Sequence, residues 1–376
     1  MKKMKILTLL LCASLAFAYM GCSNSSGGSD SGTSTPSGNN GNGTGGGQQD
    51  SSLPTGDFTQ TGYHETGSSV EINGTSYKIV TFGNYPQSLK ADNVTVSSTA
   101  TDVNGFVCYK GSDNEWYVKH GESGNEKYFK VEPIKWRVLN PAATGSEKKM
   151  LLAENVLINC AYYDFYNVNR TIGNATVYPN NYEHSRVRAF LNGLSYQKKE
   201  SDSAEQTSET VFEGKGFLQT AFTAEEIAAI AETSVVNNAR STNPDGDSNA
   251  SLWNSGDNTY ASDTPTKDKL FLLSEQEATK SAYGFAECDE YDSEGKALGE
   301  RNTRIRDATA FAQAKGAHQK DEEGYGGYWW LRSPYCEPSD SSARGKAHDV
   351  SYKGRGSGSE IVQSDWYGVV PALCLN

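Results

Sequence analysis

The sequence predicts an α+β fold behind a flexible N-terminal tether, and three observations support this. Alternating apolar and polar residues, which are typical of strands, occur in residues 68–80 and again from Tyr328 to the end. Short runs with helix-capping signals lie between these two regions. Strands, then helices, then strands in one chain predict a single α+β module. A polar low-complexity stretch precedes all of it.

Composition and charge exclude several classes of protein. The chain has 376 residues, of which 11% are aromatic, and aromatic residues are rare in disordered chains. Its formal net charge is -12, whereas phosphate binding requires clustered lysine and arginine. We therefore expect a folded protein and no nucleic-acid partner.

The N-terminus has the features of a bacterial lipoprotein leader. A basic start, residues 1–5, is followed by an apolar run, residues 6–18, that is too short to span a bilayer. The next residues resemble a lipobox that ends in Gly21 and Cys22, although Tyr19 stands where leucine is usual. This predicts a signal peptide over residues 1–21 and a lipid on Cys22, with ordinary cleavage and a free Cys22 as the alternative.

Residues 22–55 predict a flexible linker. They are rich in serine, glycine and asparagine and have no apolar face to bury. The folded domain is then expected over residues 56–376. A lipid on Cys22 would make the membrane a partner, and it would place the protein on the outer face of the inner membrane or at the outer membrane or cell surface.

The first expected elements are strands. Two alternating runs flank Asn73-Gly74, which is the strongest short-range signal for a hairpin. Residues 82–87 are expected to leave the sheet through a turn. A strand over residues 128–139, interrupted at Pro133, is expected to form a hairpin with residues 149–154.

Helices are expected next, and then the final strands. Ser185 is a suitable N-cap for residues 186–191, and capping boxes begin at Thr223 and Ser274. A further helix is expected over residues 308–315. In the strand that follows, Trp329 and Trp330 must face opposite sides, so each is expected to anchor a different layer.

Several motifs, in this order along the chain, resemble the bacterial domain family DUF6273, which is common in envelope proteins. They lie in residues 82–87, 134–139, 185–192, 221–223, 271–274, 329–333 and 368–373. The resemblance covers most of the chain from about residue 60 onward. Val370 departs from it, because the family usually has arginine at that place.

A more distant resemblance, limited to the C-terminal part, is to the C-type-lectin-like fold and its formylglycine-generating (sulfatase-modifying) group. It implies a mixed or antiparallel sheet with packed helices. That group uses two cysteines in a C-x4-C arrangement, but Leu331 stands where the partner of Cys336 would be. We therefore predict no catalytic residues of this type.

Candidate ligand-binding residues are an arginine and three aromatic residues. Arg332 lies within an aromatic strand, where it either binds a ligand or forms a buried salt bridge. Tyr328, Trp253 and Trp366 have rings that can stack on sugars, although core packing explains such residues equally well.

No metal site or cofactor is predicted. Asp245, Asp247 and Asn249 have the spacing of a calcium loop, but Ala250 and Gly256 replace the glycine and glutamate that such a loop requires. A solvated turn is therefore the preferred interpretation, with calcium as the alternative.

The cysteines and histidines carry no recognisable motif. Five cysteines follow Cys22, and their spacing matches no zinc pattern. We expect most of them to be buried thiols, and their disulfide pairing is left open: Cys108, Cys160, Cys288, Cys336 and Cys374.

These features predict a lipid-anchored cell-envelope protein with a non-catalytic module that binds or displays a glycan, a protein or another envelope component. The alternative is an extracytoplasmic enzyme of unknown type on a formylglycine-generating-like fold, using residues such as Arg332, Asp349 and Cys336. Polar groups that converge in one pocket would favour the enzyme, and an aromatic-lined surface would favour binding.

Overall fold

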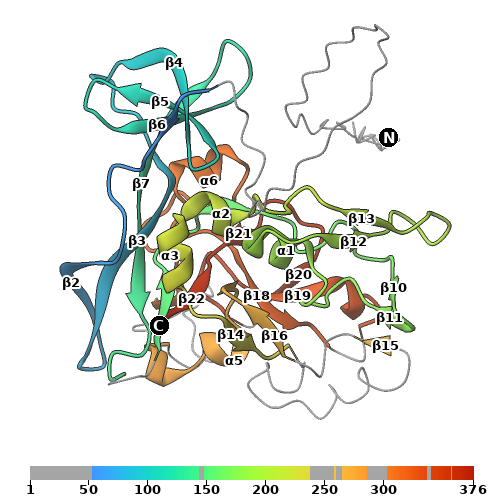
Figure 1. Cartoon of the computed structure of the whole chain (residues 1–376). Coiled ribbons are helices and arrows are strands. Elements are labelled where there is room, and N and C mark those ends of the chain that lie inside the picture. Colours follow the sequence, from blue (N-terminus) through green and yellow to red (C-terminus); the bar gives the residue numbers. More distant parts are fainter. Residues whose placement is uncertain are drawn as a thin grey trace, which may run out of the picture. The chain divides into compact units, whose positions relative to one another are not determined.

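The computed structural model describes residues 53–143, 148–237, 258–259, 265–285, 303–336, 340–356 and 358–376 (Figure 1). The predictions for the leader, for Cys22 and for the tether up to residue 52 lie outside these residues. Those for Trp253, Cys288 and the calcium loop also fall outside them.

The predicted α+β, C-type-lectin-like fold with packed helices is wrong. About 40% of the described residues lie in strands and 13% in helices, so this part of the chain is mostly β. Its α-helices are short: α1 (Arg186–Asn192), α2 (Phe217–Ala221), α3 (Ala224–Ala229), α5 (Glu275–Ala278) and α6 (Ala310–Ala314).

Helix α1 begins and ends close to its predicted bounds, and α6 is shorter than the predicted 308–315 because it begins only after Thr309. The capping boxes at Thr223 and Ser274 both form. Helix α1 stops at Gly193, whose φ of 66° is the left-handed conformation of a C-terminal cap. Helix α3 stops because Ile230 becomes extended and forms a bridge with Leu375. A cap sets the start of a helix, whereas its length depends on tertiary contacts.

Within the described residues, the larger sheet has ten strands. These are β1 (Thr55–Gly56), β2 (His64–Ile72), β3 (Thr75–Leu89), β4 (Val96–Val103), β5 (Phe106–Gly111), β6 (Trp116–His120), β7 (Lys127–Val138), β8 (Lys149–Ala153), β17 (Leu270–Phe271) and β22 (Ala372–Leu375). The order is β1-β4-β5-β6-β7-β8-β22-β17, and β3 pairs with both β7 and β2. Strands β4, β5 and β6 form the lobe at the top of Figure 1.

The predicted hairpins in this sheet are confirmed. Asn73 and Gly74 have φ angles of 48° and 73°, and they connect β2 to β3 as a two-residue turn. Strand β7 pairs with β8, as expected for residues 128–139 and 149–154.

Residues 82–87 do not leave the sheet, in contrast to the prediction. Strand β3 continues through them to Leu89. The register shifts between Thr81 and Asn84 and again between Pro86 and Leu89. These irregularities accommodate the positive φ of Gly83 and the missing N–H of Pro86, so the strand bends and stays paired.

Among the described strands, a second sheet of five carries the C-terminal motif. Its order is β20 (Gly358–Ile361), β19 (Lys346–Val350), β18 (Trp329–Pro334), β21 (Gly368–Val369) and β9 (Ile158–Asn159). The two tryptophans of β18 contact different segments, although both belong to the same hydrophobic core. The indole N–H of Trp329 donates to the carbonyl of Arg304, and that of Trp330 donates to the carbonyl of Cys160.

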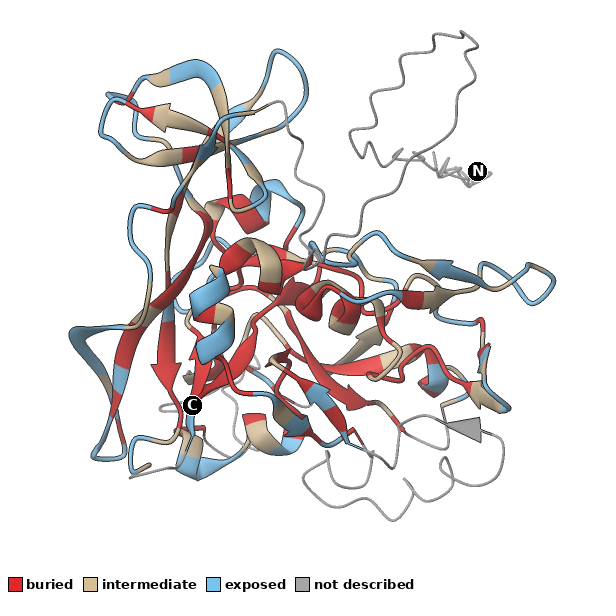
Figure 2. Cartoon of the chain, viewed as in Figure 1, coloured by how far each residue is buried: buried red, intermediate tan, exposed pale blue. Residues whose placement is uncertain are grey.

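Smaller elements complete the described part of the chain. They are β10 (Arg170–Ile172), β11 (Ala175–Val177), β12 (Tyr196–Lys198), β13 (Thr207–Glu209), β14 (Thr233–Val235), β15 (Asn258–Thr259), β16 (Thr266–Asp268), and the 3-10 turns η2 (Ser281–Tyr283) and η4 (Ala343–Gly345). Figure 2 shows the buried residues concentrated in β3, β8, β18, β19 and β22. No helix in the described ranges is long and apolar enough to cross a membrane.

Candidate functional site

Arg332, the charged residue of β18, is engaged in structural contacts. Its side chain is 4% exposed. Its Nη1 and Nη2 donate to the carboxylate of Glu277, at 2.5 and 3.0 Å. Nη1 also donates to the carbonyl of Leu272, and Nε donates to that of Val236. Burial alone would raise the pKa of Glu277, but the charge and hydrogen bonds of Arg332 lower the pKa below its usual value. This geometry favours the salt-bridge interpretation over ligand binding.

Half-buried aromatic rings gather at one end of the second sheet. They come from the segment before β18, from the turn after β19 and from the segment before β21, and we call them the aromatic platform: His318, Tyr325, Tyr328, Tyr352 and Trp366. Tyr328 is central, because its ring centroid lies 5.1 Å from those of Trp366 and Tyr352 and 5.2 Å from that of His318. Tyr325 adjoins Tyr352 at 5.5 Å.

Backbone hydrogen bonds fix the loops that carry the aromatic platform. The N–H of Gly326 donates to the carbonyl of Tyr352 at 2.9 Å, and the N–H of His318 donates to the carbonyl of Trp366 at 2.9 Å. The N–H of Gly368 donates to the carbonyl of Tyr328 at 2.9 Å. The loops that carry the rings are therefore joined to one another by backbone hydrogen bonds.

A buried carboxyl group, Asp349, lies next to the platform. The hydroxyl of Tyr367, whose ring packs on that of Tyr328, is 3.4 Å from Oδ2 of Asp349. Gly358 leaves room for this carboxyl, because a Cβ at that position would lie 2.5 Å from its Oδ1. Burial, with the nearby charge of Glu360, raises the pKa of Asp349 to about 8.

This raised pKa predicts a pH-dependent stability. Between about pH 5 and pH 7.5 the folded protein holds a proton on Asp349 that the unfolded chain has lost, so raising the pH favours unfolding. We expect the free energy of unfolding to fall by up to about 1.4 kcal/mol per pH unit relative to Asp349→Asn, which cannot ionise. Urea unfolding of both proteins across this range measures the difference. Parallel pH profiles would contradict the assignment.

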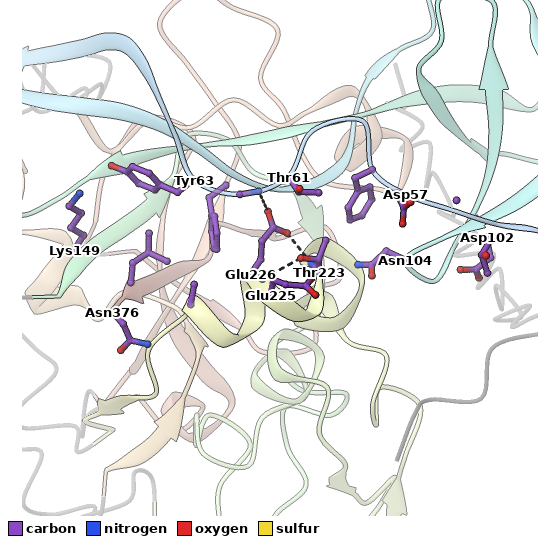
Figure 3. Close-up of a pocket in the computed structure, with 17 residues that line it drawn as sticks. Asp57, Thr61, Tyr63, Asp102, Asn104, Lys149, Thr223, Glu225, Glu226 and Asn376 are labelled. Atoms are coloured by element: carbon purple, nitrogen blue, oxygen red, sulfur yellow. Dashed lines mark hydrogen bonds between the residues drawn. The ribbon is translucent and has the colours of Figure 1, made fainter. Parts of the chain in front are cut away.

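A cavity of about 1080 Å³ lies elsewhere in the fold, between residues 55–63, helix α3 and the ends of β8 and β22 (Figure 3). Glu226 closes one wall. One of its carboxylate oxygens accepts from the N–H groups of Gly62, at 2.6 Å, and Gly83, at 3.3 Å, and the other accepts from that of Thr223 at 2.9 Å. The carboxylate of Glu226 therefore holds the wall together.

A family model described as "Domain of unknown function (DUF6273)" matches residues 146–376. The chain belongs to this family. No curated protein and no solved structure matches it. The resemblance that predicted the family from about residue 60 is thus shown only from residue 146, and the motifs at 82–87 and 134–139 lie outside the match.

The DUF6273 region contains the whole aromatic platform but only part of the cavity. Helix α3 and the ends of β8 and β22 belong to the matched residues. The opposite wall is formed by residues that come before the matched region, namely residues 55–63 with Phe82 and Asn104. The cavity is therefore lined by residues from both sides of the boundary of the family match, within one compact unit that runs from residue 47 to residue 376.

Of the four predicted ligand-binding residues, the structure brings two together. Tyr328 and Trp366 pack edge to face in the platform, Arg332 is buried away from solvent, and Trp253 lies outside the described residues. Sequence reasoning did not predict the other members, His318, Tyr325 and Tyr352. The sequence offered only a weak signal for them, because each is a residue with an aromatic ring in a polar segment close to a glycine.

The described cysteines are buried, as predicted. Cys108, Cys160 and Cys374 have free thiols, and Cys336 is 3% exposed. Burial raises the pKa of Cys160 to about 11, which keeps its sulfur protonated and unreactive at neutral pH. In the part of the chain that the structure describes, no three potential ligands converge on a metal site.

Proposed function

We propose that this member of the DUF6273 family is a lipid-anchored cell-envelope protein whose aromatic platform binds a glycan. The observation that carries the proposal is the platform itself. Its rings are half-buried and are contributed by separate loops that are joined to one another by backbone hydrogen bonds. Clustered tyrosine and tryptophan rings that keep part of their surface in solvent combine an apolar body with a polar edge, which suits a binding surface.

The chemistry around the rings suits a carbohydrate. A sugar ring has an apolar face of C–H groups and a rim of hydroxyls, and tyrosine and tryptophan likewise combine an apolar face with a polar edge. Exposed carboxylates occur in the same loops as the rings, at Asp321, Glu322 and Asp365, and the ammonium of Lys353 lies 5.6 Å from the centroid of the Tyr352 ring. These groups are suited to hydrogen bonds with sugar hydroxyls.

Burial favours binding over the enzyme of unknown type. The three residues considered for catalysis are almost inaccessible: Arg332 is 4% exposed, Cys336 3% and Asp349 2%. A catalytic group must come within hydrogen-bond reach of its substrate. The accessible groups at this end of the sheet are the rings and the charged rim.

A glycan array followed by titration of the best ligand tests the proposal. We expect Trp366→Ala to weaken binding at least about tenfold, which corresponds to about 1.4 kcal/mol. Truncated aromatic side chains at the centre of an interface commonly cost this much or more. Tyr328→Ala should have a similar effect.

The matched control is Tyr166→Ala, which removes an exposed ring that is not part of the platform. It should bind the glycan like the unmodified protein. Equal glycan affinities for all three variants would rule out the platform as the glycan-binding site. If the protein bound no glycan on the glycan array but bound a protein on a parallel protein array, the ligand of the platform would be a protein.

The lipid anchor is a proposal that rests on the leader and on Gly21-Cys22. We expect Cys22→Ala to move the protein from the detergent phase to the aqueous phase of a Triton X-114 partition. The physical reason is that the described residues contain no membrane-spanning helix, so the acyl chains would provide the attachment. Retention of the variant in the detergent phase would contradict lipidation at this residue.

A further inference from the structure

The cavity beside helix α3 has charges of opposite sign at its two ends. Figure 3 shows Asp57 and Asp102 at one end and Lys149 at the other. Asp57 and Lys149 are exposed to solvent, and Asp102 is half-buried. The ammonium of Lys149 lies 4.9 Å from the centroid of the Tyr63 ring, which places it over the cavity wall.

Between these ends the walls combine apolar groups and hydroxyls with the amide of Asn104 and the carboxylates of Glu225 and Glu226, and the carboxylate of Glu226 is taken up by backbone N–H groups. The apolar part is formed by Phe58, Tyr63, Phe82, Ala229 and Leu375, and the hydroxyls are those of Thr61 and Thr223. Ligand pockets of drug-like size usually have volumes of about 300–1,000 Å³ with this kind of lining. At about 1080 Å³, the cavity is larger than a single amino acid requires.

We propose that this cavity binds a short peptide with free termini. The peptide ammonium group lies toward Asp57 and Asp102, its carboxylate lies toward Lys149, and its side chains pack on the aromatic wall. A ligand with charges of both signs complements both ends, whereas a neutral glycan offers no charge to either. The inference rests on the cavity alone and is independent of the aromatic platform.

The position of the cavity gives binding a structural consequence. The wall at residues 55–63 is fastened to α3 through the hydrogen bond from Gly62 to Glu226, and strand β1 pairs with β4. A peptide that contacts both walls would cross-link the DUF6273 region to the segment before it. Binding should therefore raise the melting temperature of the protein, as for any ligand selective for the folded state.

The experiment uses the full-length protein and a synthetic tetrapeptide of two alanines and two phenylalanines. The peptide is prepared with both termini free, with an acetylated N-terminus, and with an amidated C-terminus. Isothermal titration should show that each modification weakens binding about tenfold, because each removes a charge that faces an opposite charge. Equal affinities for the three peptides, or no binding of the free peptide at millimolar concentration, would overturn the proposal.

Substitutions of two exposed residues test which end of the cavity binds which terminus of the peptide. Asp57→Asn should weaken the preference for a free N-terminus, because Asp102 remains, and should keep the preference for a free C-terminus. Lys149→Met should abolish the preference for a free C-terminus and keep that for a free N-terminus. Asp92→Asn and Lys148→Met are matched controls, because neither residue lines the cavity and both are exposed. If both test variants reduced both preferences equally, the proposed orientation would be wrong. Glycan binding by the same variants should be unchanged, which separates this test from that of the platform.

Discussion

Replacing Arg332 with methionine is expected to lower the free energy of unfolding by about 3 kcal/mol. Removing one partner of a buried ion pair typically costs about 3–5 kcal/mol, because the other charge is left without a partner. The lower end applies here, since the side chain of Glu277 retains 25% of its exposure and water can solvate its carboxylate in part. The carbonyls of Leu272 and Val236 also lose their donor.

Urea unfolding of two further variants tests whether the loss of stability comes from the unpaired charge of Glu277. The double variant Arg332→Met with Glu277→Gln should recover part of the loss, because no buried charge remains. Arg332→Lys should be intermediate, since an ammonium cannot reproduce the two parallel hydrogen bonds of a guanidinium. A loss of less than about 1 kcal/mol for Arg332→Met would show that the pair behaves like an exposed salt bridge.

Replacing Trp330 with alanine is expected to lower the free energy of unfolding by about 3–5 kcal/mol, the usual cost of truncating a buried aromatic side chain. Trp330 is 0% exposed. Its ring stacks on Tyr367 with centroids 4.2 Å apart and meets Tyr162 edge-on at 5.6 Å, and its indole N–H donates to the carbonyl of Cys160. The change would leave a cavity and an unpaired carbonyl.

The contrast with Trp366 makes this prediction specific. Trp366 is half-buried, so Trp366→Ala should cost less than half as much stability while it weakens glycan binding. Thermal unfolding of both variants measures the difference. Similar melting temperatures would contradict the assignment of Trp330 to the core and of Trp366 to the binding surface.

Local features of the fold could be predicted because neighbouring residues decide them. The Asn73-Gly74 turn needs only backbone freedom, and the capping box at Thr223 needs a glutamate three residues later. Trp329 and Trp330 contact different segments because side chains alternate in any strand. Strands β4, β5 and β6 were not predicted, and the error in fold class followed from missing such strands.

The candidate sites show the same division. The sequence by itself determined that Tyr328 and Trp366 are rings next to strands, that Arg332 needs a partner, and that the chain belongs among DUF6273 proteins. Only the tertiary structure decided that Arg332 is neutralised by Glu277, which lies in a helix distant in sequence. It also decided that loops distant in sequence place His318 and Tyr352 beside Tyr328. The physical reason is that these contacts depend on strand pairing and backbone hydrogen bonds between segments far apart in the chain, and neither propensity nor spacing records such pairing.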